Sequence, residues 1–532
     1  MCLGAHPQSR SKSIFARSRL RPLGGPIQRR SGPSPAAPLS FADRSNVDGF
    51  SDVTFAQQPI AGNLTRTRKL QLNLKHQGSV VLRVYRSPLL RYGSGMAQPI
   101  AFTPPRLSSR STGPVRRRIL FYLPGYDPNA GRRYRTLFVR EIHRYAKYFS
   151  IKPPQISRAV MCQDGHVQTW TVEAGIGEGR THTSYEILLW DDIVRCDMAR
   201  AHLTGAWLNA LALLHVAATG TLFRLYRASW KCGNVILYPF TMTLLLPAVV
   251  LLLAAASHGV LSVSLELPAE IAIALGLWAG LYLIWKSAPW LERAFLWQLM
   301  HDWVFNWQHA RGRRADYSAR LDAFADHALS RIREAQADEV LLVGHSTGAL
   351  TAVELAARLL ARDERLGCEG PALSLLTVGS SLPIVAMQPS ARVTRAEIKS
   401  LVISQRLVWV DYQAPQDWMN FPGFNPVHDL GLGVPLAEAA NPVIRSAKFR
   451  EIIGPETYRQ IRARPFRMHF QFLMANEHAG AFDIFALSLG NQCLRDRVIG
   501  DKALPLGGAG VQVQAGPPVG SGDRRNEAGL PL

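Results

Sequence analysis

The sequence predicts an α/β protein whose mostly parallel sheet is flanked by helices and interrupted by a long apolar insertion. Three observations carry this prediction. Short apolar runs alternate with helical stretches, which is the pattern of parallel βα units. One run turns directly into a helix through Gly344-His345-Ser346-Thr347-Gly348. Two long uncharged segments, residues 235–256 and 271–285, separate the early βα units from the later ones.

Positive charge is concentrated at the start of the chain. Residues 1–118 contain 20 Lys or Arg and 3 Asp or Glu, which accounts for +17 of the net charge of +22. The remainder is close to neutral, so we expect no nucleic-acid partner. Residues 1–115 are rich in Arg, Ser, Pro and Gly without periodicity, and we predict a disordered basic arm. Alternatives for this basic arm are an organelle transit peptide, or a native start at Met96. Within it, residues 71–85 could form a strand pair.

The cysteines do not indicate a metal site or a disulfide framework. All six are scattered and none forms a C-x-x-C pair. This usage suits a reducing compartment.

The ordered chain is expected to begin with a first part of the α/β domain at residues 116–200. Residues 119–123 form an apolar strand, and Pro124-Gly125-Tyr126 follows as a turn before an amphipathic helix at 132–149. Further strands are predicted at 157–162, 167–174 and 185–190. The last of these ends at Asp191-Asp192, for which a turn or a helix N-terminus is favoured over a metal site.

A membrane-associated insertion is predicted at residues 201–312, with spans at about 235–256 and 269–286. Twenty-two uncharged residues make a helix of about 33 Å, enough to cross a hydrocarbon core of about 30 Å. The connection at 257–270 has Glu266 and Glu270 but no Lys or Arg, whereas both outer flanks are basic. The positive-inside rule therefore predicts that both ends, and with them the α/β domain, are cytoplasmic. A buried hairpin in a soluble lid is the alternative, and residues 203–223 could form a third span.

The second part of the α/β domain is expected at residues 313–500. A core-facing helix at 317–332 precedes the strand at 340–343, and later strands follow at 373–378 and 407–412. Residues 501–532 are rich in Gly and Pro and are predicted to be a disordered tail.

The Gly-His-Ser-Thr-Gly segment suits a nucleophilic serine. A strand that turns at once into a helix strains the corner residue, and glycines on both sides remove Cβ atoms that would clash. Ser346 would then lie over the N-terminus of a helix. A purely structural glycine-rich turn is the alternative. Strand, G-H-S-x-G and helix together resemble the α/β-hydrolase superfamily, in particular its lipases and esterases.

This resemblance implies an acid and a base later in the chain, in the order Ser, Asp, His. Asp417 lies in the loop after the strand at 407–412 and is favoured over Asp411, which lies within or at the end of that strand. His469 matches the H-x-x-aromatic-Leu pattern of the resembling families and is favoured over His478. His428 comes too early in the order of the fold.

The resemblance also implies an oxyanion hole, formed by the N–H of Thr347 and one N–H from Gly125 or Tyr126. Neither a cofactor nor a metal is needed. The function expected is that of a membrane-anchored serine esterase that cleaves carboxylic esters, with a lipid or other ester as substrate and the bilayer as partner. A thioesterase or peptidase on the same fold, or a non-catalytic membrane scaffold, are the alternatives.

Overall fold

The computed structural model describes residues 70–72, 80–82 and 113–499. Most of the arm predicted at 1–115, and the tail predicted at 501–532, lie outside these residues. The chain divides into two units, Met1–Ala101 and Phe102–Leu532. In the first unit, strand β1 (Leu70–Leu72) pairs antiparallel with β2 (Val80–Leu82), one residue earlier at its start than the strand pair suggested at 71–85.

The second unit is built on a nine-stranded sheet, as the sequence predicts for an α/β fold. The strand order is β11-β10-β9-β8-β3-β7-β6-β4, and β5 also pairs with β6. The strands from β11 to β7 run parallel, whereas β6 pairs antiparallel with β7, β4 and β5. The bounds are β3 (Arg117–Leu123), β4 (Gln155–Ile156), β5 (Val160–Met161), β6 (Val167–Ala174), β7 (Thr181–Leu188), β8 (Glu339–His345), β9 (Ala372–Val378), β10 (Val408–Gln413) and β11 (Val443–Ser446).

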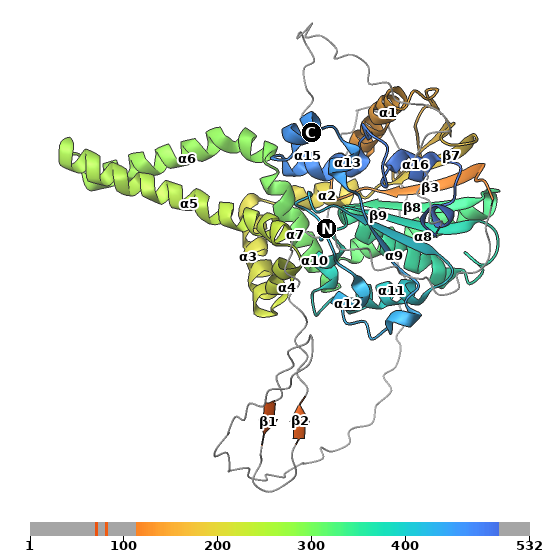
Figure 1. Ribbon diagram of the computed structural model, residues 1–532. Helices are drawn as coiled ribbons and strands as arrows, with labels where there is room; N and C mark the ends of the chain where they lie inside the picture. The colour runs from red at the N-terminus through yellow and green to blue at the C-terminus, as the bar shows by residue number, and fades with distance from the viewer. Residues whose placement is uncertain (1–69, 73–79, 83–112, 500–532) are drawn as a thin grey trace, which may run out of the picture. The chain divides into compact units, whose positions relative to one another are not determined.

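Helices cover both faces of this sheet (Figure 1). Alternate residues of β3 point to opposite faces: Ile119, Phe121 and Leu123 join one buried cluster, and Leu120 and Tyr122 join the other. The first cluster contains α8 (Ala315–Glu334), α9 (Thr347–Arg362) and α11 (Arg392–Ile403); the second contains α1 (Ala130–Tyr148) and α16 (Ile484–Leu489). Because both faces are covered, the central strands are mostly apolar, and the polar residues in them, such as Arg118 and Glu339, are buried with partners.

The insertion forms a group of helices between β7 and β8. These are α2 (Asp191–Met198), α3 (His202–Ala218), α4 (Thr221–Ala228), α5 (Trp230–Ser264), α6 (Ala269–Arg293) and α7 (Leu296–Ala310). Helix α3 buries Ala212, Leu213 and Val216 in the same cluster as Trp303 and Trp307 of α7. Among the described helices, α5 and α6 are long and apolar enough to cross a membrane, or three spans result if the bent pair α2 and α3 counts as one.

Helices α5 and α6 form a hairpin that extends away from the sheet (Figure 1). They have 35 and 25 residues, which correspond to about 52 Å and 38 Å. The turn between them is shorter than the expected connection at 257–270, because α5 continues to Ser264. Apolar side chains cover the outside of the hairpin, Trp278 and Trp285 among them, at 66% and 70% exposed.

Small residues allow the two helices of the hairpin to approach closely. Gly276 and Gly280 of α6 are four residues apart, and both are buried. A Cβ on Gly276 would lie 2.5 Å from Ala254 Cα, and one on Gly280 would lie 2.8 Å from Val250 Cα. This G-x-x-x-G spacing is typical of helices that pack in lipid.

The chain ends with short helices that carry part of the site. They are α10 (Leu382–Ala386), α12 (Pro426–Asp429), α13 (Phe449–Ile452), α14 (Pro455–Ile461), α15 (Pro465–His469) and α17 (Leu494–Ile499), with 3-10 helices η1 (Leu436–Glu438) and η2 (Phe470–Leu473). Residues 466–473 are therefore helical, so the last strand that would have favoured His478 as the base is absent from this segment.

Candidate active site

Ser346 occupies the corner between β8 and α9. Its backbone has φ 59° and ψ −127°, a conformation that strains any residue with a Cβ. The corner is held on both sides: the Ser346 N–H donates to Val378 O at 3.2 Å, and Ser346 O accepts from the Ser381 N–H at 3.3 Å. The side chain is partly exposed, whereas both neighbours, His345 and Thr347, are buried.

The two glycines of the segment are required by the closeness of the surrounding backbone. A Cβ on Gly344 would lie 2.4 Å from Gly348 O, and one on Gly348 would lie 2.1 Å from Leu123 O. No side chain fits at these separations. The spacing G-x-S-x-G therefore reflects the packing of α9 against the end of β3, as well as the bend itself.

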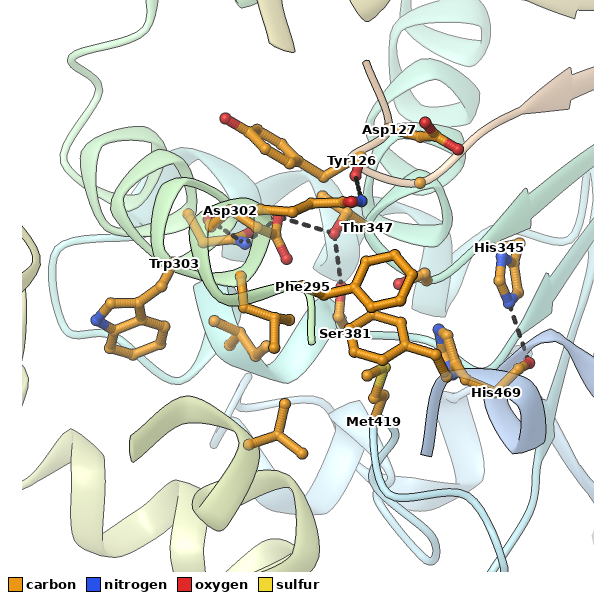
Figure 2. Close-up of a pocket in the computed structure, with 18 of the residues that line it drawn as sticks. Tyr126, Asp127, Phe295, Asp302, Trp303, His345, Thr347, Ser381, Met419 and His469 are labelled. Carbon is orange, nitrogen blue, oxygen red and sulfur yellow. Dashed lines mark hydrogen bonds between the residues drawn. The ribbon is translucent and has the colours of Figure 1, made fainter. Parts of the chain in front are cut away.

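His469 and Asp417 form a buried pair beside this corner. His469 Nδ1 lies 2.7 Å from Asp417 Oδ2, and both side chains are almost fully buried. The other carboxylate oxygen, Asp417 Oδ1, accepts from the Met419 N–H at 3.0 Å. His469 Nε2 is buried and has no hydrogen-bond partner among the described residues. Ser346 and His469 line one cavity of about 80 Å³, shown in Figure 2.

The alternative acid is placed elsewhere. Asp411 lies within β10 and accepts from Thr377 Oγ1 at 2.6 Å and Gln413 Nε2 at 2.7 Å. Burial raises its pKa, and the two hydrogen bonds oppose that rise. Its carboxylate is thus engaged by the neighbouring strand β9 and by the last residue of its own strand.

The alternative bases do not approach the serine either. His428 lies on α12 and His478 follows η2, and both side chains are exposed. Neither lines the cavity that contains Ser346. Of the sequence-predicted residues, the structure therefore brings Ser346, Asp417 and His469 together.

The loop after β3 lies directly against the serine. A Cβ on Gly125 would be 3.2 Å from Ser346 Cβ. The Gly125 N–H donates to Tyr134 Oη at 3.3 Å, so this amide already has a partner. Tyr126 is fixed at both ends: its hydroxyl donates to Asp197 Oδ2 at 3.3 Å, and its carbonyl accepts from Gln298 Nε2 at 2.7 Å (Figure 2).

His345 supports the histidine of the pair. The two rings have centroids 4.6 Å apart, and His345 Nε2 lies 3.3 Å from His469 O, which suits donation to that carbonyl (Figure 2). Burial, and secondarily the charge of His469, hold the pKa of His345 well below its usual value. His345 is therefore neutral and does not add a second positive charge when His469 is protonated. The sequence offered no signal for this role beyond its place in the motif.

Asp302 of α7 is a site residue that the sequence did not indicate. Its Oδ1 accepts from Thr347 Oγ1 at 3.1 Å and from Asn306 Nδ2 at 3.0 Å, and it lines the same cavity as Ser346 (Figure 2). Burial raises its pKa to about 7, although both hydrogen bonds act in the opposite direction. A carboxyl group that ionises near neutrality thus lies next to the start of α9.

The described residues include no group of three or more His, Cys, Asp or Glu that could hold a metal ion. Asp191 and Asp192, for which a metal was an alternative, begin α2 and face arginines. Asp191 pairs with Arg195, and Asp192 accepts two hydrogen bonds from Arg320, each of 2.8 Å.

Comparison of the chain with protein-family models, with curated proteins and with solved structures found no match. A strained serine, a buried histidine–aspartate pair and the backbone of a fixed loop meet at one cavity. These are the parts that acyl transfer through a serine requires.

Proposed function

We propose that this protein is a membrane-anchored serine hydrolase of the α/β-hydrolase type, which cleaves carboxylic esters of lipid-like substrates. One observation carries the proposal: Ser346, at a strained corner over the N-terminus of α9, shares a cavity with His469, whose Nδ1 lies 2.7 Å from Asp417 Oδ2 behind it. The strain favours a functional reason for the serine, because such conformations persist chiefly where the surrounding structure enforces them.

The reaction would proceed through an acyl-enzyme. Ser346 Oγ attacks the ester carbonyl carbon while His469 Nε2 takes its proton. The C–O bond to the alcohol then breaks, and His469 returns the proton to the departing alkoxide. Water attacks the acyl-enzyme, gives its proton to His469 and releases the acid, and Ser346 regains a proton from His469. Asp417 keeps the ring oriented and stabilises its charged form.

The oxyanion would be held by backbone amides at the corner. The Thr347 N–H is at the start of α9, where the helix dipole favours negative charge. Because the Gly125 N–H donates to Tyr134, we assign the second donor to the Tyr126 N–H. Each donor of this kind is typically worth about 3 kcal/mol in the transition state.

A fluorophosphonate probe tests this function directly. We expect the probe to attach to Ser346 in the purified full-length protein, with the modified peptide identified by mass spectrometry. The Ser346→Ala protein should remain unlabelled. If the folded wild-type protein is not labelled at Ser346, the proposal fails and a non-catalytic role becomes the better explanation.

The pH dependence of kcat/KM should reveal the ionisation of the Asp302 carboxyl group. Its carboxyl is neutral below a pKa of about 7 and negative above it. A negative charge beside Thr347 opposes the developing oxyanion, so kcat/KM for a neutral ester should fall at least about tenfold as the pH rises through this value. The Asp302→Asn protein stays neutral and should lack that fall. If kcat/KM of the wild-type and Asp302→Asn proteins depends on pH in the same way, ionisation of Asp302 does not control the reaction.

The exposed apolar hairpin supports a membrane anchor with both ends on the cytoplasmic side. Because the strands before and after the insertion pair with each other, both halves of the sheet must lie on one side, which an even number of spans satisfies. The Lys and Arg residues at the flanks favour the cytoplasm for that side.

Cysteine accessibility tests this topology. In intact cells, on a background without the native cysteines, Ser264→Cys at the hairpin turn should react with an impermeant thiol reagent. Ala319→Cys, exposed on α8, should react only after the cells are broken. If carbonate washing releases the protein and neither site reacts from outside, the hairpin is a soluble lid.

A further inference from the structure

A second cavity lies at the base of the hairpin and adjoins the one that contains Ser346. Its volume is about 900 Å³. The first turns of α5 and the end of α6 contribute Tyr238 and Arg293 to its wall, and the segment from α14 to η2 contributes a further part. Seven residues line both cavities: Arg133, Val235, Phe295, Leu299, Met419, Phe466 and Phe470. All but one of them are apolar.

The larger cavity is strongly basic. None of its lining residues is acidic, and six are arginines: Arg133, Arg140, Arg144, Arg293, Arg464 and Arg467. Two nearby carboxylates compensate half of them. Glu141 pairs with Arg140 at 2.9 Å and with Arg144 at 3.2 Å, and Asp127 pairs with Arg133 at 3.1 Å.

The other three arginines, Arg293, Arg464 and Arg467, have no carboxylate within ion-pair distance in the part of the chain that the structure describes. Burial lowers the pKa of Arg467. The charge of Glu141 opposes this, and the charges of Arg140, Arg144 and Arg464 lower the pKa further. The positive charges of Arg464, Arg140 and Arg144 therefore act against that of Arg467 across this cavity. An anion placed among them would relieve this repulsion.

The position of the cavity suggests where such an anion comes from. The predicted spans begin at about residue 235 and end at about residue 286, and the cavity is lined by residues at both of these ends. In a protein anchored by this hairpin, the cavity would lie at the level of the lipid headgroups. Arginine forks match phosphate oxygens in pairs, and anionic headgroups attract basic residues at this depth.

We propose that the arginine-lined cavity holds the phosphate of an anionic lipid while an acyl ester of the same molecule reaches Ser346. The six shared apolar residues would line the path of the chain between the two cavities, and Figure 2 shows Phe295 and Met419 lining the catalytic cavity together with His469. This inference rests on the proposed hydrolase function and names its substrate class: amphiphiles with a phosphate-bearing, negatively charged headgroup.

The test compares two short-chain lipids that differ only in the headgroup. Dihexanoyl phosphatidylglycerol carries a net negative charge, and dihexanoyl phosphatidylcholine does not. With the full-length protein in neutral detergent, we expect kcat/KM to favour the anionic lipid at least about tenfold, and Arg293→Gln/Arg464→Gln to reduce this preference to threefold or less. Both side chains are exposed and leave no carboxylate unpaired, so the change should not disturb folding.

The matched control is Arg462→Gln, which removes an exposed arginine of the same segment that does not line the cavity. It should keep the wild-type preference. If it lowers the preference as much as the double variant does, the effect is adhesion to an anionic surface and the cavity is not the site. Equal kcat/KM for the two lipids in the wild-type protein also overturns the proposal.

Binding to Ser346→Ala separates this inference from the proposed function. We expect this protein to bind the anionic lipid at least about tenfold more tightly than phosphatidylcholine, and the two arginine substitutions to abolish the difference. Inorganic phosphate should compete only weakly, at millimolar concentration; strong competition would assign the cavity to a free anion instead. If Ser346→Ala binds the anionic lipid selectively but the wild-type protein is not labelled at Ser346, the hydrolase proposal fails and the headgroup site stands. If the wild-type protein is labelled but Ser346→Ala shows no selective binding, the headgroup site fails and the hydrolase proposal stands.

Discussion

Replacing Ser346 by alanine is expected to lower kcat for ester hydrolysis by about 10⁴- to 10⁶-fold, to the residual rate that substrate binding and the oxyanion donors still support. The change removes one oxygen atom at a corner that backbone hydrogen bonds hold in place. Stability should hardly change, because alanine has the same Cβ and suffers the same strain. Turnover of a short-chain aryl ester and thermal unfolding are the measurements.

Two further variants serve as controls for this experiment. Ser400→Ala, at an exposed position of α11, should retain wild-type activity. Ser346→Gly should be as inactive as the alanine protein yet more stable by about 1 kcal/mol, because glycine adopts a φ of 59° without cost. Wild-type turnover by Ser346→Ala would show that the serine is structural.

Removing the histidine should be almost as damaging. We expect His469→Ala to lower kcat by about 10⁴-fold or more, and Asp417→Asn by about 10³- to 10⁴-fold, because the ring then loses the partner that sets its tautomer. Combining His469→Ala with Ser346→Ala should cost little more than either alone, since the two groups act as a unit. Steady-state kinetics on one neutral ester are sufficient.

The rejected alternatives provide the controls for this series. His478 is exposed, and His478→Ala should stay within about threefold of wild-type activity. Asp411 is buried among hydrogen bonds, so Asp411→Asn should affect stability more than the pH dependence of kcat. A large loss of activity in His478→Ala, with His469→Ala active, would reassign the base.

Local sequence patterns predicted the parts of this fold that depend on neighbouring residues. Apolar runs marked β3, β8, β9 and β10, because strands buried on both faces are continuously apolar. The uncharged segments marked α5 and α6 for a different reason, since these helices are long and apolar yet mostly exposed. The edge strand β11 was missed, since Val443-Ile444-Arg445-Ser446 has only two apolar residues and pairs along one side only.

The site was predictable only where a motif existed. Ser346 and His469 belonged to recognisable patterns, and Asp417 followed from its place after a strand. No sequence pattern indicated Asp302. It reaches the site because α7, which belongs to the insertion, packs against the start of α9, where Thr347 donates a hydrogen bond to Asp302. The sequence did not predict the arginine-lined cavity either. Its arginines come from α1, α6 and the segment after α14, and Arg133 and Arg467 are more than 300 residues apart in the chain. Trp303 and Trp307 lie in the core, whereas Trp278 and Trp285 are exposed, and nothing in the local sequence distinguishes the two environments.

The insertion also dictates the order in which this molecule can be made. Strand β3 needs β8 on its open side, and Arg118 of β3 pairs with Glu339, 221 residues later. A ribosome adds about 5 to 20 residues per second, so this edge waits about 10 to 45 s for its neighbour. During that interval the hairpin emerges and can enter the bilayer while the nascent chain still has an unpaired strand. Membrane insertion would thus precede closure of the sheet during biogenesis, and a failure of the translocation machinery would leave an aggregation-prone half-domain rather than a soluble enzyme.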